Sequence, residues 1–84
     1  MTIGKFAAGI AILVGYFDKP DENYAVGAEH DQFYVYPTDR PLSDEDVTAL
    51  KAAGWFQPDV RVPDGAKSRA EAPYDPREGW SCFT

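Results

Sequence analysis

The sequence predicts an α+β fold in which two helices pack on one face of a small three-stranded antiparallel sheet, in the order α-β-β-α-β. Three features predict this fold: an N-terminal apolar segment with helical spacing, two alternating segments around a polar turn, and a second helix with clear capping signals. The 84 residues correspond to a single domain, residues 1–84, and 44% of them are hydrophobic. A chain of this length buries a core of modest size.

A first helix is predicted over residues 2–17, with Thr2 as its N-cap. Residues three and four apart form one broad apolar face, namely Ile3, Phe6, Ala7, Ile10, Leu13, Val14 and Phe17. The segment is shorter than the roughly 20 residues of a membrane span, and it contains Lys5. Residues 15–18 are a poor cleavage site for a signal peptide, so we expect this helix in the core of the mature protein.

Residues 24–36 predict a β-hairpin, because two short alternating segments flank a polar turn. Successive side chains on a strand point to opposite faces of the sheet. Phe33 and Val35 are therefore expected to face the helices, while Tyr34 and Tyr36 lie on the other face. The residues opposite the tyrosines are small, which leaves room for the rings to lie flat.

A second helix is predicted over residues 43–53, and local signals mark both of its ends. Ser43 is the N-cap, and Asp44 and Glu45 place negative charge at the positive end of the helix dipole. Gly54 is expected to end the helix in a left-handed conformation. Capping alone therefore explains the acidic residues of the first turn.

The C-terminal part combines a loop and a third strand. Residues 57–78 contain four prolines and show no sustained periodicity, so they predict a long exposed loop, mobile around residues 63–72. The last segment, residues 79–84, has the composition of a strand. We expect it to return to the hairpin as a third antiparallel strand that buries Trp80 and Phe83.

The charge of the chain is concentrated in its first two thirds. The net charge is −6, with 14 acidic and 8 basic residues. Residues 1–59 carry ten acids and four bases, whereas residues 60–84 carry four of each. An acidic field repels nucleic acid, so direct DNA or RNA binding is disfavoured. Two interpretations stay open: the acidity keeps the domain in solution, or it mimics nucleic acid toward a basic surface of another protein.

Catalytic chemistry is weakly represented in the sequence. The polar turn of the hairpin, Glu29-His30-Asp31, is the only cluster with metal-ligand side chains, and neighbours on a strand point apart. A zinc site needs three or four ligands, so we expect no metal and no other cofactor. Cys82 cannot form an intramolecular disulfide, which suits a reducing compartment. The alternative is a metal- or thiol-dependent site at the turn with Cys82.

The aromatic face of the sheet points to protein binding. Exposed tyrosines on an open sheet face are typical of interfaces between proteins. They also suit base stacking in an RNA binder, which the acidic charge disfavours. Alternatively, the long loop and Tyr74 cover them. The candidate partner-binding residues are Tyr34, Tyr36, Glu29, His30, Asp31, Asp44 and Glu45.

Four short motifs carry a resemblance to a protein class. They are Ala28-Glu29-His30-Asp31-Gln32-Phe33, Leu42-Ser43 with Glu45-Asp46, Ala53-Gly54-Trp55-Phe56, and Gly79-Trp80-Ser81 with Phe83. The chain resembles small uncharacterised proteins of phages and mobile elements that run helix, hairpin, helix, Gly-Trp and a Trp-containing tail. The resemblance implies a small α+β fold and a phage or prophage origin, hence the cytoplasm of a bacterial host. It carries over no catalytic residue.

Some small acidic phage proteins inhibit host defence, including anti-CRISPR proteins. By size, charge and implied origin, this chain is therefore expected to be a non-enzymatic inhibitor. Its partner would be a host protein, such as a nucleic-acid-binding complex, and neither a membrane nor nucleic acid itself. A further alternative is a subunit of a larger assembly that makes contact through the glycine-containing first helix.

Overall fold

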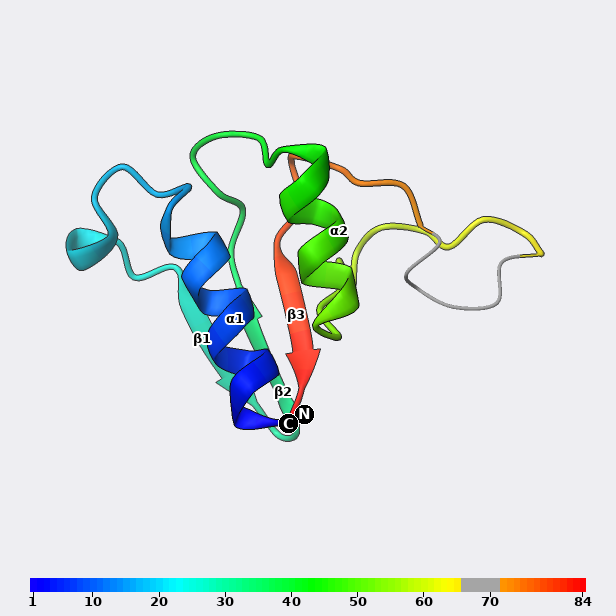
Figure 1. Ribbon diagram of the computed structural model, residues 1–84, viewed down its shortest axis with the longest axis horizontal. Helices are drawn as coiled ribbons and strands as arrows, with labels where there is room; N and C mark the ends of the chain where they lie inside the picture. The colour runs from blue at the N-terminus through cyan, green and yellow to red at the C-terminus, as the bar shows by residue number, and fades with distance from the viewer. Residues whose placement is uncertain (66–71) are drawn as a thin grey trace.

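A computed structural model describes residues 1–65 and 72–84 and confirms the predicted fold class. Its elements are α1 (Ile3–Val14), β1 (Val26–Glu29), β2 (Gln32–Val35), α2 (Asp44–Ala52) and β3 (Trp80–Phe83), with a short 3-10 turn η1 (Pro20–Glu22). The order is α-β-β-α-β, and both helices lie in front of the sheet in Figure 1. The predicted mobile segment falls in part on residues 66–71, which lie outside the described residues.

The sheet is antiparallel throughout, and β2 lies between β1 and β3. Val26 pairs with Val35, and Phe33 pairs with Cys82, so these four side chains share the face that the helices cover. The hairpin turn is shorter than predicted, because Glu29 belongs to β1. His30 has φ 56°, the left-handed conformation that a tight two-residue turn requires.

The helix α2 has the two ends that the sequence predicts. The Ser43 hydroxyl accepts a hydrogen bond from the Asp46 amide at 3.2 Å. Gly54 has φ 88°, and the Trp55 amide donates to the Leu50 carbonyl at 3.0 Å. This backbone bond is the signature of a Schellman motif, and it turns the chain so that Trp55 enters the core.

The core is aromatic and lies between the helices and the sheet. Trp55 and Trp80 are both 1% exposed. The Phe6 ring meets Phe33 edge-on, with centroids 5.0 Å apart, and stacks on Trp55 at 5.9 Å. A Cβ atom on Gly9 would overlap the indole of Trp55, so glycine is what lets α1 approach this ring.

The buried face of α1 is narrower than the sequence predicts. Thr2 is the N-cap, as expected, and its hydroxyl accepts from the Lys5 amide at 3.1 Å. However, Ile3 is 88% exposed, and Ala7 and Val14 are exposed as well, so the prediction that they face the core is wrong. Apolar residues run round the whole helix, whereas only one side meets the rest of the domain. Within residues 1–65 and 72–84, no helix has the length and apolar character needed to cross a membrane.

The segment predicted as an exposed loop, residues 57–78, is anchored at its ends. Gln57 is buried; its side-chain amide donates to the Asp75 carbonyl at 2.7 Å, and its side-chain oxygen accepts from the Asp75 amide at 2.9 Å. Ala72 is also buried. Just before this segment, Phe56 forms an isolated bridge to Ser81, with two backbone hydrogen bonds of 2.9 and 2.7 Å. The chain therefore continues the sheet past the edge of β3.

Candidate functional site

The open face of the sheet presents two tyrosines, as the alternation of β2 predicts. Tyr34 and Tyr36 lie on the face away from the helices, and their rings stack with centroids 6.0 Å apart and planes 24° apart. Tyr34 is half-buried and Tyr36 is 53% exposed. Gly27 pairs with Tyr34, and a Cβ atom there would overlap the Tyr34 ring. The small residue therefore lets the tyrosine lie flat on its neighbouring strand.

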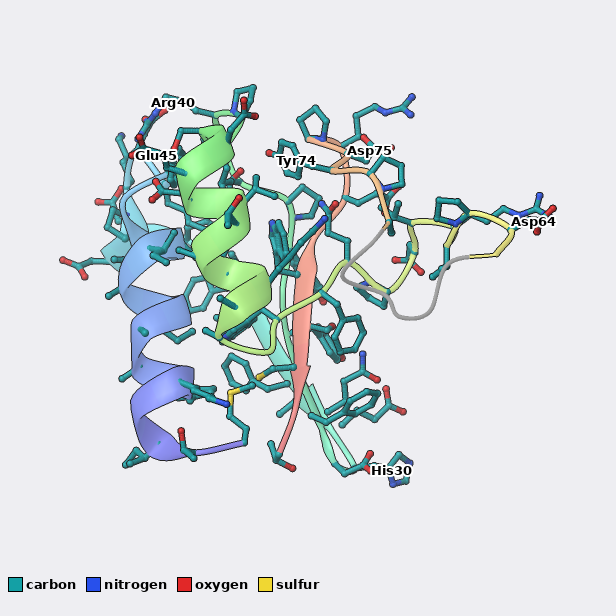
Figure 2. The ribbon with its side chains drawn as sticks, turned by 45° about the vertical axis from the view of Figure 1, so that its right-hand side comes forward. His30, Arg40, Glu45, Asp64, Tyr74 and Asp75 are labelled. Carbon is teal, nitrogen blue, oxygen red and sulfur yellow. The ribbon has the colours of Figure 1, made fainter. Side chains whose placement is uncertain are left out.

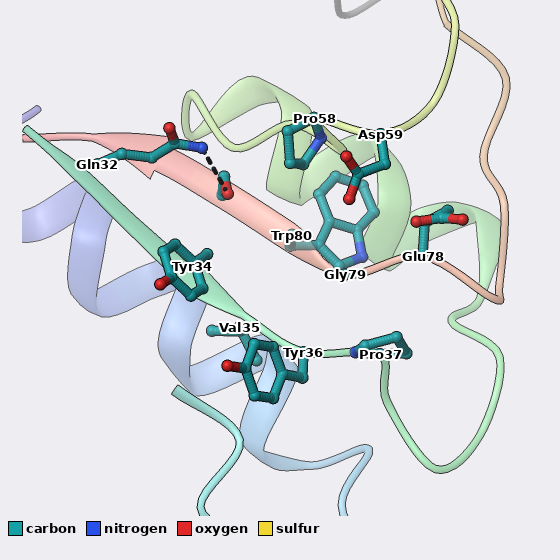
Figure 3. A pocket seen from close by; sticks show the side chains of 11 residues that line it. Gln32, Tyr34, Val35, Tyr36, Pro37, Pro58, Asp59, Glu78, Gly79 and Trp80 are labelled. Atoms are coloured by element: carbon teal, nitrogen blue, oxygen red, sulfur yellow. Dashed lines mark hydrogen bonds between the residues drawn. The ribbon is translucent and has the colours of Figure 1, made fainter. Parts of the chain in front are cut away.

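These tyrosines form one wall of a groove of about 300 Å³, which we call the tyrosine groove (Figure 3). It is lined by Gln32, Tyr34, Val35, Tyr36, Pro37, Pro58, Asp59, Glu78, Gly79, Trp80 and Ser81. Figure 3 shows Tyr34 and Tyr36 on one side, with Pro58 and Asp59 opposite. The Gln32 side chain closes one end by donating to the Ser81 hydroxyl at 3.0 Å.

The second wall is held by contacts between segments that are distant in sequence. The bridge from Phe56 to Ser81 places the chain beside β3 just before Pro58 and Asp59. The Gln57 amide also donates to the Glu78 carbonyl at 3.1 Å, which ties the two parts of this wall together. Because Gln57 is buried, these bonds are shielded from water and fix the backbone that carries both acidic residues.

The tyrosine groove is acidic. Asp59 and Glu78 line it, and no basic residue does. Neither carboxylate forms a hydrogen bond or an ion pair with any residue in the described part of the chain. The nearby Arg77 guanidinium bonds to the Asp75 carboxylate at 3.0 Å, and this hydrogen bonding lowers the pKa of Asp75 below 3.8, while Arg77 interacts more weakly with the charge of Glu78. The groove thus offers two carboxylates beside aromatic rings.

The structure places the seven candidate partner-binding residues in three groups. Tyr34 and Tyr36 stack on each other on the open face of the sheet. Glu29, His30 and Asp31 are exposed at the hairpin turn, whereas Asp44 and Glu45 are exposed in the first turn of α2 on the helix side. Figure 2 shows His30 and Glu45 at opposite ends of the molecule. The tyrosines, the hairpin turn and the first turn of α2 therefore lie in separate parts of the surface.

The alternative that the long loop and Tyr74 partly cover the tyrosines does not hold for Tyr74. Tyr74 stacks on Trp80 with centroids 6.1 Å apart, and its hydroxyl accepts from the Leu42 amide at 2.9 Å. Both contacts belong to the helix side of the sheet, so Tyr74 does not line the groove. The long loop instead contributes Pro58, Asp59 and Glu78 as a wall, and it leaves Tyr36 open to solvent.

The proposed thiol or metal site finds no support in the geometry. Cys82 is fully buried on the helix-facing side, and its burial raises the pKa of the thiol above the ordinary 9.0. His30 lies exposed in the turn. Among residues 1–65 and 72–84, no group of three or more His, Cys, Asp or Glu side chains could hold a metal ion.

The acidic wall of the groove was missed in the sequence. Asp59 and Glu78 are separated by most of a loop without periodicity, and a one-residue bridge is what brings their segments together. The sequence contains one weak signal, which is that the apolar residue Phe56 directly follows Trp55. Such a run after a helix cap is consistent with a further sheet contact.

The comparisons with known proteins add no assignment. The chain matches no protein-family model, and neither curated proteins nor solved structures gave a significant match. The resemblance to small phage proteins therefore stays a prediction.

Proposed function

We propose that this chain is a small non-enzymatic protein-binding protein that attaches to its partner through the tyrosine groove. The observation that carries the proposal is the pair of stacked tyrosines, Tyr34 and Tyr36, standing open on the uncovered face of the sheet. Tyrosine combines a large apolar contact area with a hydroxyl group, and it is enriched among the residues that dominate binding energies. The two rings also stack on each other before binding, which lowers the entropy cost of ordering them on association.

The charge of the chain supports a basic partner. The net charge is −6, and the two charged groups that line the groove are the carboxylates of Asp59 and Glu78. An acidic protein associates fastest with a positively charged surface, and it repels nucleic acid. We therefore propose a host protein whose basic surface binds nucleic acid, with this chain as an inhibitor that occupies that surface. Action in the bacterial cytoplasm, as the implied phage origin suggests, belongs to the same proposal.

The proposal is tested by comparing two exposed tyrosines. Tyr36→Ala removes half of the stacked pair, whereas Tyr24→Ala removes a ring that is 92% exposed and lies outside the tyrosine groove. Purified, tagged proteins are used to capture partners from host lysate, and each partner's affinity is then measured with purified components. Tyr36→Ala is expected to weaken binding by about tenfold or more, as for a central interface tyrosine. Tyr24→Ala is expected to leave the affinity unchanged.

The partner is then assayed for nucleic-acid binding with and without this chain. Competition for the basic surface predicts that the chain displaces the nucleic acid, and that Tyr36→Ala needs a correspondingly higher concentration. A captured protein that binds both tyrosine variants equally would contradict the proposal. So would a partner that keeps its nucleic acid when saturated with this chain.

A further inference from the structure

The shape and charge of the tyrosine groove suit one kind of side chain. Its tyrosine wall offers aromatic faces, and its opposite wall carries two carboxylates, neither of which forms a hydrogen bond or an ion pair within the described chain. We infer that the groove binds an arginine side chain on an extended segment of the partner protein. This inference rests on the function proposed above and names the chemistry of the group that the groove receives.

The aromatic wall favours a planar cation. A guanidinium group stacks on a tyrosine ring through cation–π attraction and through contact between flat surfaces. Tyr36 is 53% exposed, so its ring has free surface for such a contact. A phosphate or a carboxylate would instead meet the negative faces of the rings and the acidic wall, which excludes anionic ligands from this groove.

The acidic wall completes the recognition. A guanidinium has five N–H donors in one plane, so a group stacked on Tyr36 still points donors sideways, across the groove. Asp59 and Glu78 stand on that opposite side, as Figure 3 shows. Carboxylates that accept from guanidinium form charge-assisted and frequently bidentate hydrogen bonds. A lysine ammonium supplies the charge but lacks the planar face and the paired N–H donors of a guanidinium, so arginine is favoured.

The size of the groove limits the partner segment to extended chain. A volume of about 300 Å³ lies at the lower end for ligand pockets, so it takes one long side chain with its flanking backbone but no folded element. Pro37 and Pro58 line the groove and offer apolar contacts to residues on either side of the arginine. Grooves lined by aromatic residues commonly bind extended, proline-rich segments.

The inference is tested by titrating isotope-labelled protein with capped peptides while recording amide NMR spectra. The probe is an acetylated and amidated Gly-Pro-Arg-Pro-Gly peptide, and its matched controls carry citrulline or lysine in place of arginine. The arginine peptide is expected to shift the amide signals of Tyr36, Gly79 and Ser81. Citrulline keeps the shape but loses the charge, so it is expected to bind at least about tenfold more weakly.

The same titration with protein variants tests whether a groove carboxylate binds the peptide. Glu78→Gln removes a charge from the groove and is expected to lower the affinity for the arginine peptide by about tenfold. Asp64→Asn removes an exposed charge that does not line the groove, so the affinity is expected to stay unchanged. Equal binding of the arginine, lysine and citrulline peptides, or no shift with any of them, overturns the inference.

The two proposals fail in different ways. If Tyr36→Ala abolishes capture of a partner while no peptide binds and Glu78→Gln has no effect, the groove binds protein without an arginine. If instead the arginine peptide binds and Tyr36→Ala leaves partner capture intact, the groove recognises arginine but does not hold the partner. The first result overturns the inference alone, and the second overturns the proposed function.

Discussion

Each side of this sheet has a glycine that lies against an aromatic ring, but the two contacts have different roles. On the helix side, Gly9 makes room for the ring of Trp55, which is 1% exposed. On the open side, Gly27 makes room for the ring of Tyr34, which is half-buried. Both glycines lie under an aromatic ring, but only the first ring is enclosed. The contact between Gly9 and Trp55 therefore stabilises the fold, whereas the contact between Gly27 and Tyr34 shapes a surface.

The largest expected effect comes from filling the space at Gly9. Alanine is normally better than glycine inside a helix by about 1 kcal/mol. At Gly9, however, the added Cβ would overlap the indole of Trp55, which is packed on all sides and has no room to move. Gly9→Ala is therefore expected to destabilise the domain by about 1–3 kcal/mol, as overpacking does in other cores. Denaturant unfolding followed by tryptophan fluorescence measures this change.

The same helix provides a matched control. A Cβ on Gly4 would meet nothing within 4 Å, and this position is exposed. Gly4→Ala is therefore expected to stabilise the domain by up to about 1 kcal/mol, which is the opposite sign. If both substitutions stabilise to the same extent, α1 does not pack on Trp55 as described here.

A smaller effect is expected at Gly27, on the open side. The atoms that an added Cβ would meet lie at the far end of the Tyr34 ring, and this side chain can swing into solvent. Alanine also costs less conformational entropy than glycine in a strand. Gly27→Ala is therefore expected to change the free energy of unfolding by less than about 1 kcal/mol while it displaces the tyrosine ring.

The displacement of the ring is the measurable consequence of Gly27→Ala. The aromatic proton signals of Tyr34 and Tyr36 are expected to move, because the two rings no longer stack at 6.0 Å. The affinity for the partner is expected to fall together with the stacking. A loss of stability as large as that of Gly9→Ala would show that the two sides of the sheet are equally rigid.

The features that could be predicted from the sequence are those whose interacting residues lie close together along the chain. The ends of α2 depend on residues a few positions apart, so Ser43 and Gly54 could be recognised as caps, and the structure has both. The alternation of β2 likewise fixed the sides of Phe33 and Tyr34. The caps of α2 and the alternation of β2 can be predicted because they depend on residues that are close together in the sequence.

The features that the sequence missed depend on packing across the chain. The apolar pattern of α1 shows which residues tolerate burial, but the number of neighbouring elements decides how many of them are buried. Only one side of α1 has such neighbours, so Ile3 remains exposed. The acidic wall of the groove likewise depends on the bridge between Phe56 and Ser81 and on the bonds of Gln57, none of which leaves a periodic trace.

The smallest expected effect concerns the turn that carries the acidic wall. The Arg77 guanidinium lowers the pKa of Asp75 mainly through side-chain hydrogen bonds, one of which is 3.0 Å long. Because the folded pKa is below 3.8, the stabilisation from this pair is present above pH 3.8 and is lost as the pH falls through the lowered pKa. Arg77→Gln is expected to return the pKa of Asp75 toward 3.8.

NMR titration of the Asp75 carboxyl group measures this shift, and Arg61→Gln is the control because Arg61 has no ion pair with the rest of the described chain. Global stability at neutral pH is expected to fall only slightly, since the Arg77 side chain is largely exposed to solvent and Gln57 holds the Asp75 backbone independently. The amide signal of Glu78 is expected to titrate together with Asp75, because both residues lie in the same turn. An Asp75 carboxyl that titrates at 3.8 in the unmodified protein would show that Arg77 does not order this wall.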